Sequence, residues 1–321
     1  MKKIAAILTL TVSSSVFAWE PQKSIKAYSP FTVGSANDIA LRITSSAVEK
    51  NTKVTFIVDT KPGAGGYLAN DYINKQKPDG YEMGALSIPS LGATDKIMMP
   101  NKSFSATDFT YALNIASIPM TIVALPNDPV SNIKDFARVM KTEKVTIGDP
   151  GAAARLVYEL SAEYIGFTEG PNNVVRVEYK GPADTLRDVM GGQIRFGIMP
   201  LAVSKTAHDA GKVKIIAVTS KNPLNALPGV QTASSAYPDF IFNLEVVIAL
   251  PPNTPKNILD WYTTQFNKVL SQKEVVETLE KNMMFVNKDL LTSEYLTEYI
   301  RSYEKRYSRI VEKVINSSNN K

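Results

Sequence analysis

The stretch YSPFTVGSANDIALR, residues 28–42, decides the fold of the chain. A β-rich segment ends at Tyr28, and a loop that contains Gly34 follows it. Ser35, with Asp38 three residues later, fits the pattern that caps a helix. The stretch therefore predicts a strand, a loop and a helix in succession. The expected helix carries its apolar residues at helical spacing, at Ile39, Ile43 and Ala47.

The same succession returns along the chain. Loops rich in glycine, proline or serine follow β-rich runs at 61–66, 87–90, 148–151 and 179–182. Strands that alternate with helices predict an α/β protein with parallel sheets, in which such loops share one edge. The first turn of each helix also offers unpaired backbone N–H groups to an anion.

Each joint also has a purely structural explanation, as a tight turn or a helix cap. The loop 61–66 is not a P-loop, because no Gly-Lys-Ser/Thr follows it. It also lacks the third glycine of a dinucleotide fingerprint.

Arg155 lies in the first turn of a helix expected over 152–164. A cation is disfavoured there by the helix dipole, so Arg155 is a candidate partner for an anion. The alternative is a solvated surface arginine. Glu159 and Glu163, four residues apart on this helix, are expected to line a solvated face.

Composition excludes several classes of function. The chain has no cysteine and one histidine, His208, which excludes disulfides and leaves no histidine metal site. His208 lies on a polar segment without a nucleophile motif, and the sequence offers no way to pair two carboxylates for glycoside hydrolysis. The formal charge of +5 is too low and too dispersed for a nucleic-acid-binding protein. No catalytic residue, metal or cofactor is predicted.

The amino terminus has the pattern of a secretory signal peptide. Lys2 and Lys3 precede an apolar run over 4–12, and small residues lead to Ala18. We expect cleavage after Ala18 and an exported, soluble chain. The apolar run is too short to span a bilayer.

Further helix boundaries are predicted in the second half. Ser131 is expected to cap one helix, and Thr254 another with Pro255 at its first position. The last helix, with apolar residues spaced three and four apart over 296–314, is expected to pack on the body of the protein rather than form a coiled coil.

Taken in order, these motifs resemble one family, the substrate-binding proteins of tripartite tricarboxylate transporters, called TctC-like or Bug proteins. The resemblance covers essentially the whole chain after residue 18. The motifs are Gly34-Ser35 with Asn37-Asp38 and Arg42, Pro62-Gly63-Ala64-Gly65-Gly66, Pro78-Asp79-Gly80-Tyr81, Leu125-Pro126, Tyr179-Lys180-Gly181, Gly191-Gly192-Gln193, Leu227-Pro228-Gly229 and Ala249-Leu250-Pro251-Pro252-Asn253-Thr254-Pro255.

The resemblance implies the periplasmic binding protein type II fold. Two lobes, each a mostly parallel sheet flanked by helices, are joined by two crossing strands that act as a hinge. Lobe 1 is expected to comprise residues 19–122 and 222–321, and lobe 2 residues 123–221. The crossings are expected near 121–126 and between 220 and 250.

The resemblance also implies a non-catalytic protein of the periplasm, and we expect this protein to be a monomer. It would capture a small organic carboxylate in a cleft between the lobes and deliver it to the membrane permease subunits of a transporter. A subunit that presents its ligand to a membrane sensor kinase, and a secreted hydrolase on the same scaffold, are the alternatives. The implied ligand-binding residues are Val33, Gly34, Ser35, Asn37, Asp38, Gly65, Gly66, Ser87, Ser90, Gly151, Ala152, Arg155 and Tyr179.

The chain departs from the family pattern at several of these loops. Ser35 replaces a glycine, and the alanines over 152–154 replace hydroxyl side chains. Arg195 and Pro200 stand where acidic residues are usual. The ligand class is therefore open, between a site in which Arg155 replaces the hydroxyls and a site that suits a less polar acid.

Overall fold

The structure is a computed structural model that describes residues 19–94, 99, 104–149, 151–179 and 181–319. The predicted signal peptide, residues 1–18, lies outside this part. In the described part, nine strands form one continuous sheet in the order β2-β1-β3-β9-β4-β7-β5-β6, with β8 paired to β4. The strands are β1 Ile25–Ser29, β2 Phe56–Thr60, β3 Glu82–Ser87, β4 Thr110–Ala124, β5 Val145–Asp149, β6 Val174–Glu178, β7 Phe196–Pro200, β8 Lys214–Val218 and β9 Asn243–Leu250.

Strand β4 belongs to both halves of the sheet. Its residues 110–119 pair with β9, and its residues 120–124 pair with β7. We call the half with β1, β2, β3 and β9 lobe 1, and the half with β5, β6, β7 and β8 lobe 2. The chain returns to lobe 1 after β8, where the Thr219 N–H donates to the Met120 carbonyl at 2.9 Å. The residue limits predicted for the lobes stay a prediction.

Each half contains one strand that runs against the others. In lobe 1, β1 is parallel to β2 and β3, whereas β9 is antiparallel to both β3 and β4. In lobe 2, β5 is parallel to β6 and β7, whereas β4 is antiparallel to β7 and β8. The expected pair of mostly parallel sheets is confirmed, and the opposing strands are the two that cross.

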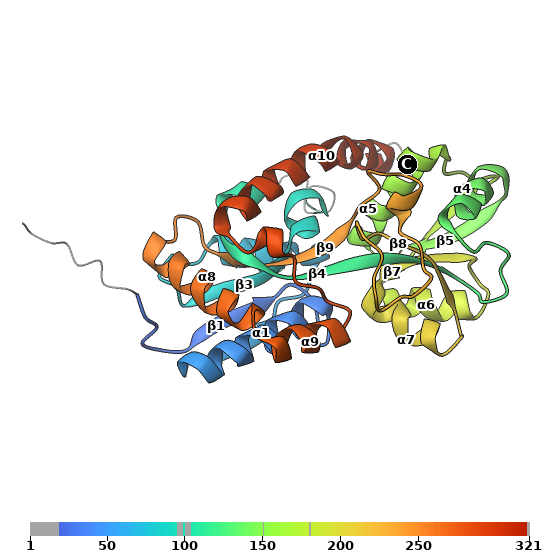
Figure 1. The fold of residues 1–321 in the computed structure, drawn as a ribbon. Coiled ribbons are helices and arrows are strands. Elements are labelled where there is room, and N and C mark those ends of the chain that lie inside the picture. Colours follow the sequence, from blue (N-terminus) through green and yellow to red (C-terminus); the bar gives the residue numbers. More distant parts are fainter. Residues whose placement is uncertain (1–18, 95–98, 100–103, 150, 180, 320–321) are drawn as a thin grey trace, which may run out of the picture.

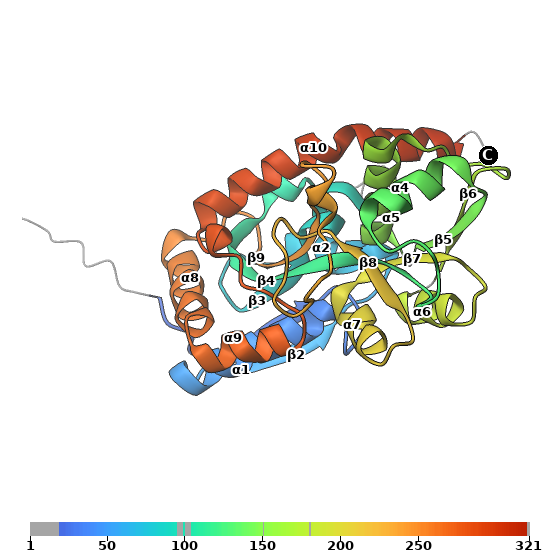
Figure 2. The ribbon, with the colours of Figure 1, turned by 45° about the vertical axis from the view of Figure 1, so that its right-hand side comes forward.

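Helices cover both faces of each half (Figures 1 and 2). Buried side chains of α1, α8 and α9 pack on one face of lobe 1, and those of α6 and α7 on one face of lobe 2. The remaining faces carry α2, α4, α5 and α10. The helices are α1 Ala36–Thr52, α2 Tyr67–Asn74, α4 Ile133–Thr142, α5 Ala152–Ser161, α6 Pro182–Met190, α7 Leu201–Asp209, α8 Lys256–Leu270, α9 Lys273–Lys281 and α10 Ser293–Asn319.

Two predicted helix caps are wrong by one residue. The cap of α4 is Asn132 rather than Ser131, because the Asn132 Oδ1 atom accepts from two backbone N–H groups at 3.0 Å. The cap of α8 is Pro255, and the hydroxyl of Thr254 instead donates to the Pro251 carbonyl at 2.7 Å. Helix α9 was not predicted.

Helix α10 extends over both lobes (Figure 1). It contacts β4 and the short π-helical turn η2, Ser90–Thr94, and it also contacts α5 in lobe 2. Its Arg309 pairs with Glu163 at 3.1 Å. The expected packing of this helix on the body of the protein is confirmed, since its apolar residues Leu296, Ile300, Tyr303, Tyr307 and Ile310 are buried.

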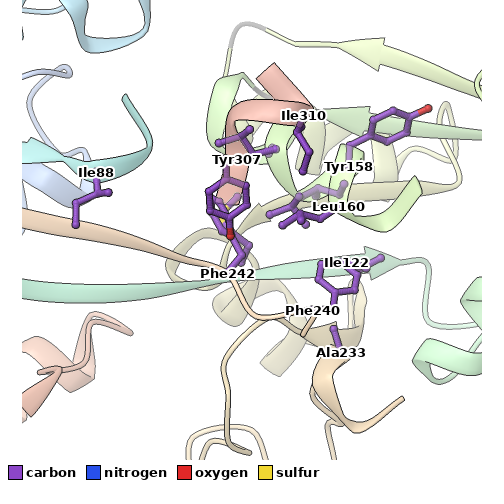
Figure 3. Close-up of a cluster of buried hydrophobic side chains, with 14 of the residues drawn as sticks. Ile88, Ile122, Tyr158, Leu160, Ala233, Phe240, Phe242, Tyr307 and Ile310 are labelled. Carbon is purple, nitrogen blue, oxygen red and sulfur yellow. The ribbon is translucent and has the colours of Figure 1, made fainter. Parts of the chain in front are cut away.

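One buried cluster joins the lobes beneath α10. It combines Ile88, which follows β3, with Tyr158 and Leu160 of α5, Phe242 before β9 and Tyr307 of α10 (Figure 3). Burial of such apolar side chains is the main favourable contribution to folding. The lobes therefore share a hydrophobic core on this side of the sheet.

Where the two crossing strands pair, a carboxyl group is buried. Glu245 of β9 lies opposite Ser117 of β4 and is 1% exposed. Its Oε2 atom accepts hydrogen bonds from the Ser117 hydroxyl and from the Asn114 side-chain amide, the latter at 2.7 Å. Burial raises the pKa of Glu245 to about 7, and these hydrogen bonds oppose the rise only in part.

We expect Glu245→Gln to flatten the pH dependence of stability. The folded protein holds Glu245 neutral up to about pH 7, whereas the unfolded chain ionises it near its ordinary pKa of 4.5. Its contribution to the free energy of unfolding is therefore complete below pH 4.5 and falls by roughly 3 kcal/mol up to about pH 7. Urea denaturation from pH 4.5 to 8 measures this fall as the difference between the native protein and the variant.

The matched control is Glu280→Gln, which changes an exposed carboxylate of α9. Its profile should keep the pH dependence that Glu245 gives to the native protein, because Glu245 is unchanged in this variant. A native protein and a Glu245→Gln variant with parallel pH profiles would contradict the prediction.

Candidate functional site

The carboxyl ends of the parallel strands in the two lobes point toward each other. Strand β4 runs in the direction of β1, β2 and β3 as it passes from lobe 1 into lobe 2. Strands β5, β6 and β7 run opposite to β4, and therefore back toward lobe 1. Helix α5, which follows β5, contacts η2, which follows β3. We call the region between these two edges the junction.

The loop between β1 and α1 is held by its own carboxylate. Asp38 accepts from the Gly34 N–H and from the Arg42 Nε atom, both at 2.9 Å. The Ser35 hydroxyl oxygen accepts from the Asp38 N–H at 3.3 Å and caps α1, as predicted. In a capping box the acidic side chain accepts from the backbone N–H of the cap residue. Here the Asp38 side chain accepts instead from the N–H of Gly34, one residue before the cap, and Gly34 has a positive φ of 82°. This conformation suits glycine.

The other predicted residues of this loop have different environments. Asn37 is buried, and its side-chain amide donates to the Ala85 carbonyl at 2.8 Å. This hydrogen bond connects α1 to β3, and it engages the side-chain amide of Asn37 with a partner inside lobe 1. Val33, in contrast, is 71% exposed, so an apolar side chain stands in the solvent beside Gly34.

Gly66 lies against the residues that follow β1 and β3. With a φ of 106°, it is the N-terminal cap of α2, and no side chain caps this helix. A Cβ atom at Gly66 would lie 3.1 Å from the Ser90 Oγ atom and 3.5 Å from Pro30. The Ser90 hydroxyl donates to the Ser87 carbonyl at 3.0 Å. The structure thus brings Gly66, Ser87 and Ser90 together, with Gly65 beside them in the turn Ala64–Gly66.

Helix α5 begins in the same way on the other side of the junction. Gly151, with a φ of 119°, is its cap, and no side chain caps the helix. Ala152 is its first residue, so its N–H and those of the next two residues have no partner within the helix. Ala153 packs against the cluster that joins the lobes and also against the lobe 1 cluster beneath α1, α8 and α9, and the second contact places this first turn beside lobe 1. The backbone here is suited to an anion.

An ion pair that was not predicted supports this turn. Asp149, the last residue of β5, is 1% exposed and accepts from the Arg176 Nη1 atom at 2.8 Å and from the Gly151 N–H at 3.1 Å. Burial raises the pKa of the Asp149 carboxyl, although Arg176 opposes this rise. The only signal in the sequence was an aspartate directly after a buried strand. Its partner depends on the register of β5 and β6.

Arg155 and Glu159 form a salt bridge within α5. Their atoms Nη2 and Oε1 are 2.6 Å apart, and the side chains are 14% and 6% exposed. The expectation that Glu159 lies on a solvated face is therefore wrong, because this face of α5 is covered by packing. The predicted binding of a ligand by Arg155 stays a prediction, and its guanidinium has a partner in the same helix.

Two further residues, Tyr179 and Arg195, have partners outside the junction. The Tyr179 hydroxyl donates to Asp188 of α6 at 2.9 Å, and its ring packs beside Gly148. Arg195 precedes β7 and so lies at the opposite edge of the sheet, where it pairs with Asp128 at 2.8 Å. The departure at Arg195 therefore does not shape the junction, whereas Pro200 ends β7 on the junction side.

A surface pocket lies beside α2, apart from the junction residues just described. Its charged residues Asp71 and Lys75 pair with each other at 2.7 Å. Lys61 lies over the ring of Tyr72, 4.0 Å from its centroid. Within the described ranges no group of three or more acidic, histidine or cysteine side chains is placed to hold a metal ion. None of the helices in these ranges is both long and apolar enough to cross a bilayer.

Comparisons with known proteins agree with this architecture. The family model for the tripartite tricarboxylate transporter family receptor matches residues 40–315. A UPF0065 protein of Bordetella bronchiseptica is 24% identical over 274 residues, which cover 84% of this chain and 79% of that protein. The periplasmic binding protein BugD has a similar structure, with a TM-score of 0.76, 23% identity, and coverage of 92% of this chain and 98% of BugD. The R. palustris protein Rpa4515, determined with adipate, gives a TM-score of 0.77, 22% identity, and coverage of 92% and 98%.

The chain belongs to the tripartite tricarboxylate transporter receptor family, the TctC or Bug proteins. The members of this family are non-enzymatic solute-binding receptors of transport systems. The resemblance drawn from the sequence motifs is thereby confirmed, and so is the fold that it implied.

We expect Asp38→Ala to destabilise the protein and to weaken ligand binding. The change removes two hydrogen bonds to a buried carboxylate and frees the loop at Gly34. Loss of charge-assisted bonds of this kind costs about 2–3 kcal/mol. Urea denaturation measures the cost, and calorimetry with a bound acid measures the loss of affinity.

Asp71→Ala is the control, because Asp71 takes part in a pair of the same i,i+4 type whose lysine is exposed to solvent. A pair that is screened by solvent in this way contributes little to stability. Equal losses of stability in the two variants would show that Asp38 has no special role in the loop.

Proposed function

We propose that this protein binds a small organic carboxylate at the junction. The observation that carries the proposal is that the parallel strands of both lobes end at the junction, where α1 begins after Gly34 and α5 after Gly151, and that α5 contacts η2 of lobe 1. Their backbone N–H groups and dipoles favour a negative charge between them. The adipate in the structure of the relative Rpa4515 supports a carboxylate as the ligand class.

A few such bonds are sufficient for tight binding. Each charge-assisted hydrogen bond to a carboxylate contributes about 1.5–3 kcal/mol. Three or four of them, less the cost of ordering the ligand, give affinities near the micromolar range, about 8 kcal/mol. Movement of the lobes about β4 and β9 would bury the bound acid. The closed form would then present the surface that docks on the membrane permease subunits.

Screening by thermal denaturation tests the proposal. A ligand that binds only the folded protein stabilises it by about 2.7 kcal/mol at one hundred times its dissociation constant. For a chain of this length we expect the true acid to raise the melting temperature by roughly 3–6 °C. The panel contains mono-, di- and tricarboxylates, including adipate.

The uncharged methyl esters of the same acids are the controls, because they cannot accept charge-assisted bonds. They should leave the melting temperature unchanged. A protein that none of the acids stabilises, or that esters stabilise as well as acids, would contradict a carboxylate site.

We also propose that the chain is exported to the periplasm with cleavage after Ala18. Trp19 would then be the first residue of the mature protein. Its ring packs against Trp261 and Tyr81, with centroids 5.4 and 5.8 Å away, so this end is anchored on lobe 1. We expect the amino-terminal sequence of protein purified from a periplasmic extract to begin at Trp19. A mature protein that keeps residues 1–18 would contradict this proposal.

A further inference from the structure

The charge of Arg155 is balanced inside its own helix. Side chains in a helix lean toward its amino terminus, so the heads of Arg155 and Glu159 both lie toward the first turns of α5. Their separation of 2.6 Å and their low exposure mark a tight, largely desolvated pair. An anion that reaches this turn therefore meets a neutral pair rather than a cation.

Two neighbouring ion pairs are balanced in the same way. Arg176 pairs with Asp149 directly before α5, and Arg42 pairs with Asp38 in the first turns of α1. Both aspartates are buried and each accepts the N–H of the adjacent loop glycine. Each of these resident carboxylates would repel a second carboxylate of a ligand, whereas the backbone N–H groups beyond them can hold one.

Apolar side chains stand beside these ion pairs in both lobes. Ala153 and Ala154 line the first turn of α5, and Ala153 contacts the lobe 1 cluster beneath α1, α8 and α9. Across the junction, Val33 exposes an isopropyl group to solvent. An apolar ligand that covers such groups removes their surface from water, and this burial contributes about 25 cal/mol of favourable free energy per Å².

We infer that the ligand of this site carries a single carboxylate and an uncharged, largely apolar remainder. The inference rests on the proposed function and narrows it. A second carboxylate would lose its hydration at the junction, where Arg155 is held by Glu159, and burial of a charge without a partner is strongly unfavourable. A hydrocarbon remainder has no such cost.

Calorimetry with matched acids tests the inference. Hexanoate and adipate have six carbons each and differ by one carboxylate, and benzoate and terephthalate form an aromatic pair. We expect the native protein to bind the monocarboxylate of at least one pair at least tenfold more tightly than its dicarboxylate. Tighter binding of adipate or terephthalate would overturn the inference and leave the proposed function standing. So would binding of a tricarboxylate when neither pair binds.

A protein that binds no carboxylate at all would overturn the proposed function, and the inference with it. The native protein alone distinguishes these outcomes, so the test does not depend on the folding of a variant.

Glu159→Gln then tests the role assigned to the salt bridge. The change releases Arg155 from its partner and should raise the affinity for adipate relative to hexanoate by about tenfold, the equivalent of one charge-assisted bond. Glu163→Gln, which changes the surface partner of Arg309, is the control and should leave this ratio unchanged. An unchanged ratio in a folded Glu159→Gln variant would show that Arg155 does not set the ligand class.

Discussion

The arrangement of the site depends on the double pairing of one strand. Strand β4 completes lobe 1 next to β9 and then continues into lobe 2 next to β7. Because it runs with the parallel strands of lobe 1 and against those of lobe 2, the loops that follow both sets must converge. The amino-terminal ends of the helices that follow these loops therefore lie at one junction instead of at two separate edges of the sheet.

In the described part of the junction, three ion pairs balance the charged side chains discussed above, whereas the first N–H groups of α5 have no partner within the helix. Asp38, Asp149 and Glu159 each form an ion pair with an arginine. The two aspartates also accept a hydrogen bond from the backbone N–H of a glycine. The resident ion pairs thus shape the loops and leave little net charge on the side chains. The first turns of α1 and α5 remain as the positive component, through N–H groups that no helical carbonyl can satisfy.

Much of this was predictable from local sequence, and the rest depends on packing. The joint at Gly34, the Ser35 cap and the glycine start of α5 follow from short-range rules and were predicted. The pair Asp149–Arg176 requires the register of β5 against β6, which no local pattern contains. Arg155 and Glu159 stand at the spacing of a helical ion pair, but burial decides their importance, and that burial comes from tertiary packing around α5. The α4 cap was misplaced because Ser131 and Asn132 are both good caps in sequence.

The same reasoning explains why a carboxyl group is buried where the strands cross. A shift of β9 against β4 by one residue would turn Glu245 to the opposite face and away from Asn114 and Ser117. A buried carboxyl without these partners is costly, so the hydrogen bonds hold the two crossing strands in one register. That register sets how far β4 extends into lobe 2, and hence where the loops of lobe 2 meet those of lobe 1. A polar group far from the junction in sequence thus helps to define its geometry.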